Sequence, residues 1–199
     1  MTKTILIATT NTGKQTELLA LLQSEKYNLV TPQDLSISLK VAETGSTYAE
    51  NARLKAAAFC KASGLPSLAD DTGLEVFALD NAPGLFSARF SPKPGATDSD
   101  RRALLVSKLN GVSTPWTARF MCAMAFVLPD GSFYQSHGIC DGEIIPEERG
   151  NGGFGYDPIF LCEGTNHTMA ELSMPEKNYI SHRAKAVDGI LPYIDSALT

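Results

Sequence analysis

The chain has 199 residues, of which 43% are hydrophobic and 20% are charged, and its formal net charge at pH 7 is −5. This length allows one large domain or one domain with two lobes, and the negative charge argues against nonspecific binding of nucleic acid through a broad basic face. The apolar run at the amino end, residues 5–8, is too short for a signal peptide or a membrane span. We therefore expect a protein that binds neither nucleic acid nor a membrane.

The cysteines exclude two further classes of site. Cys60, Cys122, Cys140 and Cys162 are not spaced as in a metal site or a redox motif. Each has apolar neighbours, which predicts buried thiols in a reducing cytoplasm. With only three histidines in the chain, a zinc site is disfavoured.

The first part of the chain alternates apolar runs with helical patterns. Residues 3–10 are predicted to form a buried strand, residues 11–13 break it, and leucines at helical spacing predict a helix from residue 14 onward. A second helix is predicted from Thr47, which has the spacing of a capping box with Glu50, to a stop at Gly64. A short strand then ends at Ala69.

The second part predicts an irregular loop over residues 80–96, a helix over 98–109, and two strands over 116–128 and 132–140. The even positions of the strand over 116–128 are all apolar, which predicts a stripe facing the core. A last helix is expected after Ser181, its predicted N-cap, with Pro192 bending or dividing it. This order predicts a single α/β domain over residues 1–199, with a long mixed sheet flanked by helices.

The turn between the first strand and the first helix has the composition of a phosphate site. Amides at the start of a helix point at an anion, Gly13 allows close approach, and Lys14 adds a positive charge. The candidate phosphate-binding residues are Thr9, Thr10, Asn11, Thr12, Gly13 and Lys14. An ordinary strand-to-helix turn uses similar residues, so both interpretations stay open for this segment alone.

Two adjacent carboxylates, Asp70 and Asp71, stand between the apolar runs 65–69 and 74–79. An unpaired ionised group is so costly to bury that it shifts its pKa or finds a cation. We therefore expect the pair at the open end of a strand, where Glu43 joins it in binding Mg²⁺ and one Asp orients or deprotonates water. A solvated turn with an acidic tip is the alternative.

A competing motif is the triplet Asp71-Thr72-Gly73, which also occurs in aspartic proteases. Those enzymes need two such triplets facing each other, within one chain or across a dimer. This chain has one, so only a homodimer could work as such a protease, and nothing else in the sequence supports it.

A glycine-rich segment over residues 152–158 is a third candidate. Three glycines in four positions disfavour both strand and helix, so the backbone adopts unusual conformations or approaches a ligand closely. Phe154 offers a stacking plane for a nucleobase and Asp157 offers a hydrogen-bond acceptor. A plain glycine-rich turn is the alternative.

Basic residues form the last candidate. Lys55 lies four residues after Asn51, on the same helix face, where it either reaches a phosphate or is solvated. His182 and Arg183 begin the last predicted helix, where the helix dipole disfavours positive charge. This misfit indicates an electron-rich partner at that position.

Together these segments resemble the inosine triphosphate pyrophosphatase family, the XTP/dITP diphosphatases that remove deaminated purine nucleotides. The motifs cover nearly the whole chain, at residues 10–14, 43–45, 50–52, 55, 69–74, 82–84, 87–89, 152–158 and 181–183. The resemblance implies an elongated α/β fold with a long central sheet and two lobes around a central cleft. It also implies a homodimer and dependence on Mg²⁺.

By this resemblance, residues 9–14 and Lys55 hold the triphosphate, while Glu43 and Asp71 bind the metal. Asp71 is the expected proton acceptor, with Asp70 beside it as a second catalytic residue. The other implied substrate contacts are Thr72, Phe154, Gly155, Tyr156, Asp157, Lys177, His182 and Arg183. The implied reaction is hydrolysis of ITP, dITP or XTP to the nucleoside monophosphate and pyrophosphate, which keeps these nucleotides out of DNA and RNA.

Three questions stay open at this point. Relatives often carry two consecutive glutamates where Ala42 precedes Glu43, and an essential first glutamate would make this metal assignment wrong. The sequence does not say which aspartate is the base. A Maf-like pyrophosphatase with another base preference and a non-catalytic nucleotide-binding module are the alternatives, and the intact acidic set argues against the second.

Overall fold

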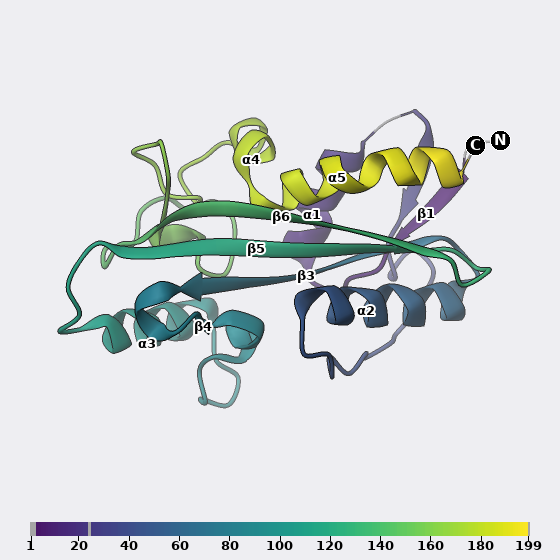
Figure 1. Ribbon diagram of the computed structural model, residues 1–199. Coiled ribbons are helices and arrows are strands. Elements are labelled where there is room, and N and C mark those ends of the chain that lie inside the picture. Colours follow the sequence, from purple (N-terminus) through teal and green to yellow (C-terminus); the bar gives the residue numbers. More distant parts are fainter. Residues whose placement is uncertain (1–2, 24, 199) are drawn as a thin grey trace. The chain divides into compact units, whose positions relative to one another are not determined.

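The computed structural model describes residues 3–23 and 25–198, which form the predicted mixed α/β fold (Figure 1). The strands are β1 (Lys3–Ile7), β2 (Tyr27–Val30), β3 (Ser67–Val76), β4 (Ala82–Pro83), β5 (Trp116–Val127), β6 (Phe133–Ile144) and β7 (Phe160–Cys162). The α-helices are α1 (Thr12–Leu22), α2 (Tyr48–Ser63), α3 (Asp98–Leu109), α4 (Met174–Ile180) and α5 (His182–Ala197). Short 3-10 helices span Phe77–Leu79, Gly84–Arg89 and Asp157–Ile159.

The strands pair in the order β2-β1-β3-β5-β6-β7, with β4 paired to β3. β1 is parallel to β2 and β3, whereas β4 and β7 pair antiparallel with β3 and β6. In the β1–β3 register Ile7 lies opposite Leu68. The loop that follows β1 therefore begins at the level of Asp70, two residues further along β3.

Contacts divide the chain into two compact units. The first unit comprises the chain up to Asp71, Cys122–Gly138 and the chain from His182 onward, and the second comprises Thr72–Met121 and Ile139–Ser181. The second unit has one core, built among others from Leu74, Leu105, Leu109, Trp116 and Phe160.

The first unit has a core on each face of its sheet. Ile5, Ile7 and Leu68 pack with residues of α1 and α5 on one face. Leu6 and Ala69 pack with residues of α2 on the other face, and Figure 1 shows α5 and α2 on opposite sides of the strands. Because successive side chains of a strand point to opposite faces, this alternation directs Asp70 toward α1 and α5 and Asp71 toward α2.

The prediction that β3 ends at the aspartate pair is wrong. β3 continues through Asp70 and Asp71 to Val76. The solvated turn is also wrong, because Asp70 is 1% exposed and Asp71 is 8% exposed. A strand tolerates two such acids because each of them finds cations within the protein, as described below.

Other predicted boundaries moved for local reasons. β1 ends at Ile7 rather than at residue 10, and α1 begins at Thr12 rather than at 14, because the Asn11 side chain caps it by accepting from the Lys14 amide at 3.0 Å. Half of the predicted capping box of α2 is confirmed, since Thr47 Oγ1 accepts from the Glu50 amide at 3.1 Å. The Glu50 carboxylate instead accepts from the amide and hydroxyl of Ser46.

Toward the carboxyl end, the helix predicted over residues 98–109 is confirmed as α3. β5 ends at Val127 rather than at 128, and β6 spans Phe133–Ile144 rather than ending at 140. α4 was not predicted, and Ser181 separates it from α5. α5 runs through Pro192 without interruption, so the predicted division of that helix is wrong.

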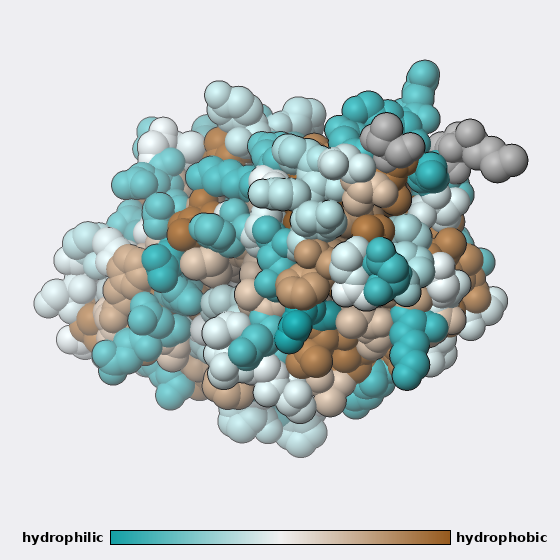
Figure 2. Space-filling model, turned by 45° about the vertical axis from the view of Figure 1, so that its right-hand side comes forward, coloured by the Kyte–Doolittle hydropathy of each residue, from teal (hydrophilic) through white to brown (hydrophobic). Residues whose placement is uncertain are grey.

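The four cysteines are buried free thiols, as predicted. Among the described residues, no helix has the length and apolar character needed to cross a bilayer. Figure 2 shows hydrophilic and hydrophobic side chains interspersed over the visible face, in keeping with a 20% content of charged residues.

Gly138 on β6 fixes how closely α5 approaches the sheet. A Cβ atom at this position would lie 2.1 Å from the carbonyl oxygen of His182 and 2.6 Å from the amide nitrogen of Ala186. We expect Gly138→Ala to lower the free energy of unfolding by about 1–3 kcal/mol, because the first turn of α5 must move. Urea denaturation measures this loss, and Asp188→Ala at an exposed position of α5 serves as the control. Equal stability of the two variants would contradict the close packing.

Candidate active site

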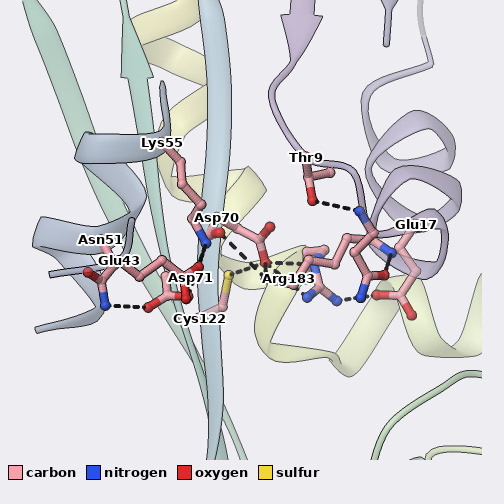
Figure 3. Close-up of polar contacts among 11 residues, drawn as sticks. Thr9, Glu17, Glu43, Asn51, Lys55, Asp70, Asp71, Cys122 and Arg183 are labelled. Atoms are coloured by element: carbon pink, nitrogen blue, oxygen red, sulfur yellow. Dashed lines mark hydrogen bonds and ion pairs between the residues drawn. The ribbon is translucent and has the colours of Figure 1, made fainter. Parts of the chain in front are cut away.

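The aspartate pair of β3 organises two clusters of charged side chains in the first unit (Figure 3). Asp70 points toward Arg183 and Glu17, and Asp71 points toward Glu43 and Asn51. This is the arrangement that strand alternation requires of neighbouring residues. Each acid thus has its own surroundings and its own chemistry.

Asp70, Lys14, Glu17 and Arg183 form the Asp70 cluster. Arg183 donates from Nη2 and Nε to Asp70 Oδ2 at 3.0 and 3.3 Å, and it also pairs with Glu17 through Nη1. Lys14 Nζ lies 3.1 Å from the same Asp70 oxygen. Arg183, Asp70 and Glu17 are 1%, 1% and 4% exposed, so this part of the network is buried, whereas the Lys14 side chain is 13% exposed.

Burial and charge act in opposite directions on these cations. Desolvation lowers the pKa of Lys14, and the nearby positive charges of Lys55 and Arg183 add to this effect, so its pKa lies below the ordinary value despite Asp70. Desolvation also acts to lower the pKa of Arg183, but Asp70 and Glu17 outweigh it and raise that pKa. Arg183 therefore stays charged. The sequence predicts an electron-rich partner for the start of α5, and the carboxylates of Asp70 and Glu17 are such partners.

Asp71, Glu43, Asn51 and Lys55 form the Asp71 cluster. Lys55 Nζ lies 2.9 Å from Glu43 Oε1 and 3.1 Å from Asp71 Oδ1, so one ammonium group bridges both carboxylates. Asn51 donates from Nδ2 to the other oxygen of Asp71 at 3.1 Å. Desolvation acts to lower the pKa of Lys55, but the surrounding carboxylates, Asp71 first, raise it above its usual value. Lys55 is not the solvated lysine of the alternative interpretation.

The predicted phosphate loop begins where β1 ends, at the level of Asp70. Thr9 Oγ1 accepts from the Asn11 amide at 3.2 Å, and Gln15 donates to the Thr9 carbonyl at 2.7 Å. These bonds fix the turn into α1. Within residues 3–23 and 25–198, no acceptor is recorded for the amides of Thr12 and Gly13, the first two residues of the helix. The loop thus offers helix-start amides next to the Lys14 ammonium group.

The second unit holds a separate group, the Asp157 cluster of Phe154, Asp157 and Lys177. Lys177 Nζ lies 2.6 Å from Asp157 Oδ2, and the same oxygen accepts from the Phe154 amide at 3.0 Å. The ammonium group also stands 5.6 Å from the centre of the Phe154 ring. Asp157 and Lys177 are each 4% exposed, so the turn holds a buried ion pair. A Cβ at Gly153 would lie 2.0 Å from Asp157 Oδ2, which explains the glycine there.

Other predicted residues lie outside these three clusters. The Tyr156 hydroxyl donates to the Ser87 carbonyl at 2.9 Å and is buried in the core of the second unit. Thr72 follows Asp71 on β3 and is partly exposed. His182 is buried at the first position of α5.

Glu17 and Asn51 were not predicted as site residues. Glu17 could have been found as a charged residue three positions after Lys14 and beside the apolar stripe of α1. Asn51 could have been found because its helical spacing places it on the same face as Lys55. Neither sequence signal identifies the carboxylate or amide partner that the fold supplies.

The residues present fit a magnesium ion. Glu43 and Asp71 carry oxygen donors that already share one cationic partner, the Lys55 ammonium group. Among the described residues there is no group of three or more His, Cys, Asp or Glu side chains arranged to hold a metal. Two carboxylates suffice for Mg²⁺, which commonly retains waters and substrate phosphates.

Lys55 occupies the space between the two carboxylates that the metal would share. We expect Lys55→Met to increase the affinity for Mg²⁺ without nucleotide by roughly tenfold, because a neighbouring positive charge is removed. If Lys55 holds the triphosphate, as the resemblance implies, the same variant should also lose turnover. Thermal unfolding at increasing Mg²⁺ concentration measures the affinity, with Lys61→Met on the exposed surface of α2 as the control. A weaker response to Mg²⁺ in Lys55→Met would contradict this assignment.

Comparisons with known proteins identify the family of this chain. The model of the Ham1 family matches residues 5–193. A dITP/XTP pyrophosphatase of Desulforamulus reducens is 45% identical over 184 residues, covering 92% of this chain and 91% of that protein. A dITP/XTP pyrophosphatase of Streptomyces coelicolor is 44% identical over 196 residues, covering 98% of each.

Two solved structures show the same fold. A HAM1 protein from Coxiella burnetii has a TM-score of 0.86 and 38% identity, covering 98% of this chain and 99% of that one. The Ham1 protein of Staphylococcus aureus has a TM-score of 0.84 and 37% identity, covering 98% of this chain and all of that one. The resemblance drawn from the sequence is confirmed, and the chain belongs to the Ham1 family.

Proposed function

We propose that this protein hydrolyses the deaminated purine nucleoside triphosphates ITP, dITP and XTP to the nucleoside monophosphate and pyrophosphate, keeping them out of DNA and RNA. Relatives at 44% and 45% identity over nearly the whole chain carry the name dITP/XTP pyrophosphatase. The observation in this chain that carries the proposal is the aspartate pair of β3. Its two acids face opposite sides, one sealed by Arg183 and one paired with Lys55 beside Glu43.

We assign the proton transfer to Asp71. The oxygen of a water molecule forms a bond to the α-phosphorus, the bond from that phosphorus to the bridging oxygen of the pyrophosphate breaks, and the water proton passes to the Asp71 carboxylate. Asp70 is the weaker candidate for the base, because it is paired with two cations, Arg183 and Lys14, and is 1% exposed, whereas Asp71 is paired with one and is 8% exposed. In this proposal Asp70 holds Lys14 in place beside the phosphate loop.

The same clusters supply the groups that a triphosphate needs. Glu43 and Asp71 would hold Mg²⁺, which when bound neutralises charge on the phosphate oxygens. The amides of Thr12 and Gly13 bind phosphate oxygens, with the ammonium groups of Lys14 and Lys55 adding charge. Thr9, Thr10 and Asn11 complete this predicted set.

In this proposal the Asp157 cluster supplies base contacts, while His182 and Arg183 stay predicted substrate contacts. Phe154 provides the stacking plane for the base. Hypoxanthine and xanthine carry a hydrogen-bond acceptor, the 6-carbonyl, where adenine carries an amino group, so the site needs hydrogen-bond donors to select them. Thr72, Gly155 and Tyr156 stay predicted substrate contacts. The proposal also includes dependence of the activity on Mg²⁺, assembly into a homodimer and a location in the cytoplasm. It includes no binding to nucleic acid or to a membrane. Sedimentation equilibrium tests the dimer.

A panel of nucleotides tests the proposal. We expect release of pyrophosphate from ITP, dITP and XTP that depends on Mg²⁺, with GTP and ATP slower by about 10²-fold or more. Orthophosphate as the product, or equal rates with ATP, would contradict the proposal. A maximum on another nucleotide would favour the Maf-like alternative, and binding without release of pyrophosphate would favour the non-catalytic module.

A further inference from the structure

The glycine segment of the second unit is held by charged side chains from an element that none of the sequence motifs includes. Asp98, the first residue of α3, accepts from the amide of Gly155 through Oδ2 at 2.8 Å. Arg102, one turn further along the helix, donates from Nη1 to the carbonyl oxygen of Gly155 at 2.7 Å. Both backbone groups of one glycine are therefore bound by α3, and we call Asp98 and Arg102 the α3 clamp.

Both residues of the α3 clamp are themselves fixed. Arg102 makes a two-pronged pair with Glu148, from Nε and Nη2 to the two carboxylate oxygens at 2.8 Å each. Asp98 uses its other oxygen to pair with Arg101, which also donates to the carbonyl of Ala96 at 2.8 Å. Two-pronged arginine pairs restrict the orientation of the guanidinium group, so the donor to Gly155 is preorganised.

Packing alone does not hold Gly155 in its conformation. Its φ is +62°, in the left-handed region, and a Cβ added there would meet no atom within 4 Å. By contrast, a Cβ at Gly153 would collide with Asp157. Hydrogen bonds from α3 therefore fix the backbone at Gly155, whereas close contact fixes it at Gly153.

Phe154 lies between these two anchors. Its own amide donates to Asp157, and the next residue along the chain is bound by α3. The ring also faces the Lys177 ammonium group, which is itself paired with Asp157. The direction of the aromatic plane thus depends on both anchors, and α3, which holds the second one, lies outside the predicted motifs.

We propose that Asp98 and Arg102 are positioning residues that set purine selectivity by fixing Gly155 and hence the plane of Phe154. The inference rests on the proposed function for the meaning of selectivity. The α3 clamp belongs to the second unit, and the acids assigned to the chemistry belong to the first. Loss of the α3 clamp should therefore weaken and broaden binding of the base while leaving the chemical step intact.

The test compares Asp98→Asn, Arg102→Gln and Arg102→Lys in steady-state hydrolysis of ITP and GTP. We expect Asp98→Asn and Arg102→Gln to raise KM for ITP about tenfold and to lower the ITP-to-GTP ratio of kcat/KM about tenfold, with kcat on saturating ITP within about twofold of the unmodified chain. Arg102→Lys should recover part of both losses, because its ammonium group retains a donor but not the two-pronged pair.

Arg119→Gln is the matched control. Arg119 lies in the same unit and donates from Nε to Glu75 at 2.8 Å, as Arg102 does to Glu148, but has no recorded bond to the glycine segment. It should retain both KM and the selectivity ratio. An unchanged KM and ratio in Asp98→Asn and Arg102→Gln, or an equal loss of kcat on all nucleotides, would overturn the inference.

Amide hydrogen exchange at Gly155, followed by NMR, separates failure of this inference from failure of the proposed function. The Gly155 amide should exchange about tenfold faster in Asp98→Asn than in Arg119→Gln, whatever the substrate is. Unchanged exchange would overturn the α3 clamp. If no deaminated nucleotide yields pyrophosphate with the unmodified chain, the proposed function fails independently of the exchange result.

Discussion

Asp71→Asn should lower kcat for hydrolysis of ITP by about 10³-fold while lowering the free energy of unfolding by only about 1–2 kcal/mol. The amide keeps the shape of the side chain and an oxygen toward Lys55, but it accepts no proton from water and no hydrogen bond from Asn51. It also weakens the oxygen donor set that Asp71 shares with Glu43. Both effects act on turnover, and neither removes a packed group from the core.

Release of pyrophosphate from saturating ITP measures the rate, and urea denaturation measures the stability. Asp188→Asn, at an exposed position of α5, is the matched control and should leave both values unchanged. If Asp71→Asn retained the rate of that control, Asp71 would play no part in the chemistry. A loss of rate matched by a collapse in stability would instead assign Asp71 a structural role.

The sequence predicted the framework of the fold well because the core residues follow regular periods. α3 was placed at Asp98–Leu109 as observed, and α2 was placed between the Thr47 cap and Gly64. Gly64 ends the helix in the left-handed conformation, with φ at +70°. Helix starts and ends of this kind depend on residues close together in the sequence, so the sequence alone predicts them.

The prediction and the structure differ most at β3, because two adjacent aspartates predict an exposed strand end there. The strand continues because its two acids are neutralised by Lys14, Lys55 and Arg183, which lie 56, 16 and 113 positions away along the chain from the aspartate they contact. No short stretch of the sequence contains the aspartate pair together with all three of these cations. Only the tertiary fold makes a buried Asp-Asp step acceptable in the middle of a strand.

Most residues of the three clusters were named from the sequence, but their grouping was not. Alternation along β3 separates Asp70 from Asp71, and Glu17 enters the Asp70 cluster although no motif indicated it. The amide and carbonyl of Gly155, a predicted substrate contact, are bound by α3, an element outside the motifs. The contact partners of these residues depend on the tertiary fold and are visible only in the structure.

Arg183→Met should lower the free energy of unfolding by about 3–5 kcal/mol, the cost typical of breaking a buried ion pair by removing one partner. Arg183 and Asp70 are each 1% exposed, and Glu17 is 4% exposed. Methionine has a similar length and fills much of the space, so the loss reports charge more than packing. Without the guanidinium group, two carboxylates remain in a sealed site with Lys14 as the nearest cation for Asp70.

A double-mutant cycle isolates this electrostatic part. Glu17→Gln removes one of the stranded carboxylates, so the double variant Glu17→Gln/Arg183→Met should be less destabilised than the sum of the single variants by about 1–3 kcal/mol. Urea denaturation of the four proteins gives the coupling energy. Arg53→Met, at an exposed arginine of the same unit that lies over the Phe133 ring, is the control and should cost less than about 1 kcal/mol. Additive losses would mean that Glu17 and Arg183 are not coupled. An Arg183→Met variant as stable as the control would mean that the network contributes no stability.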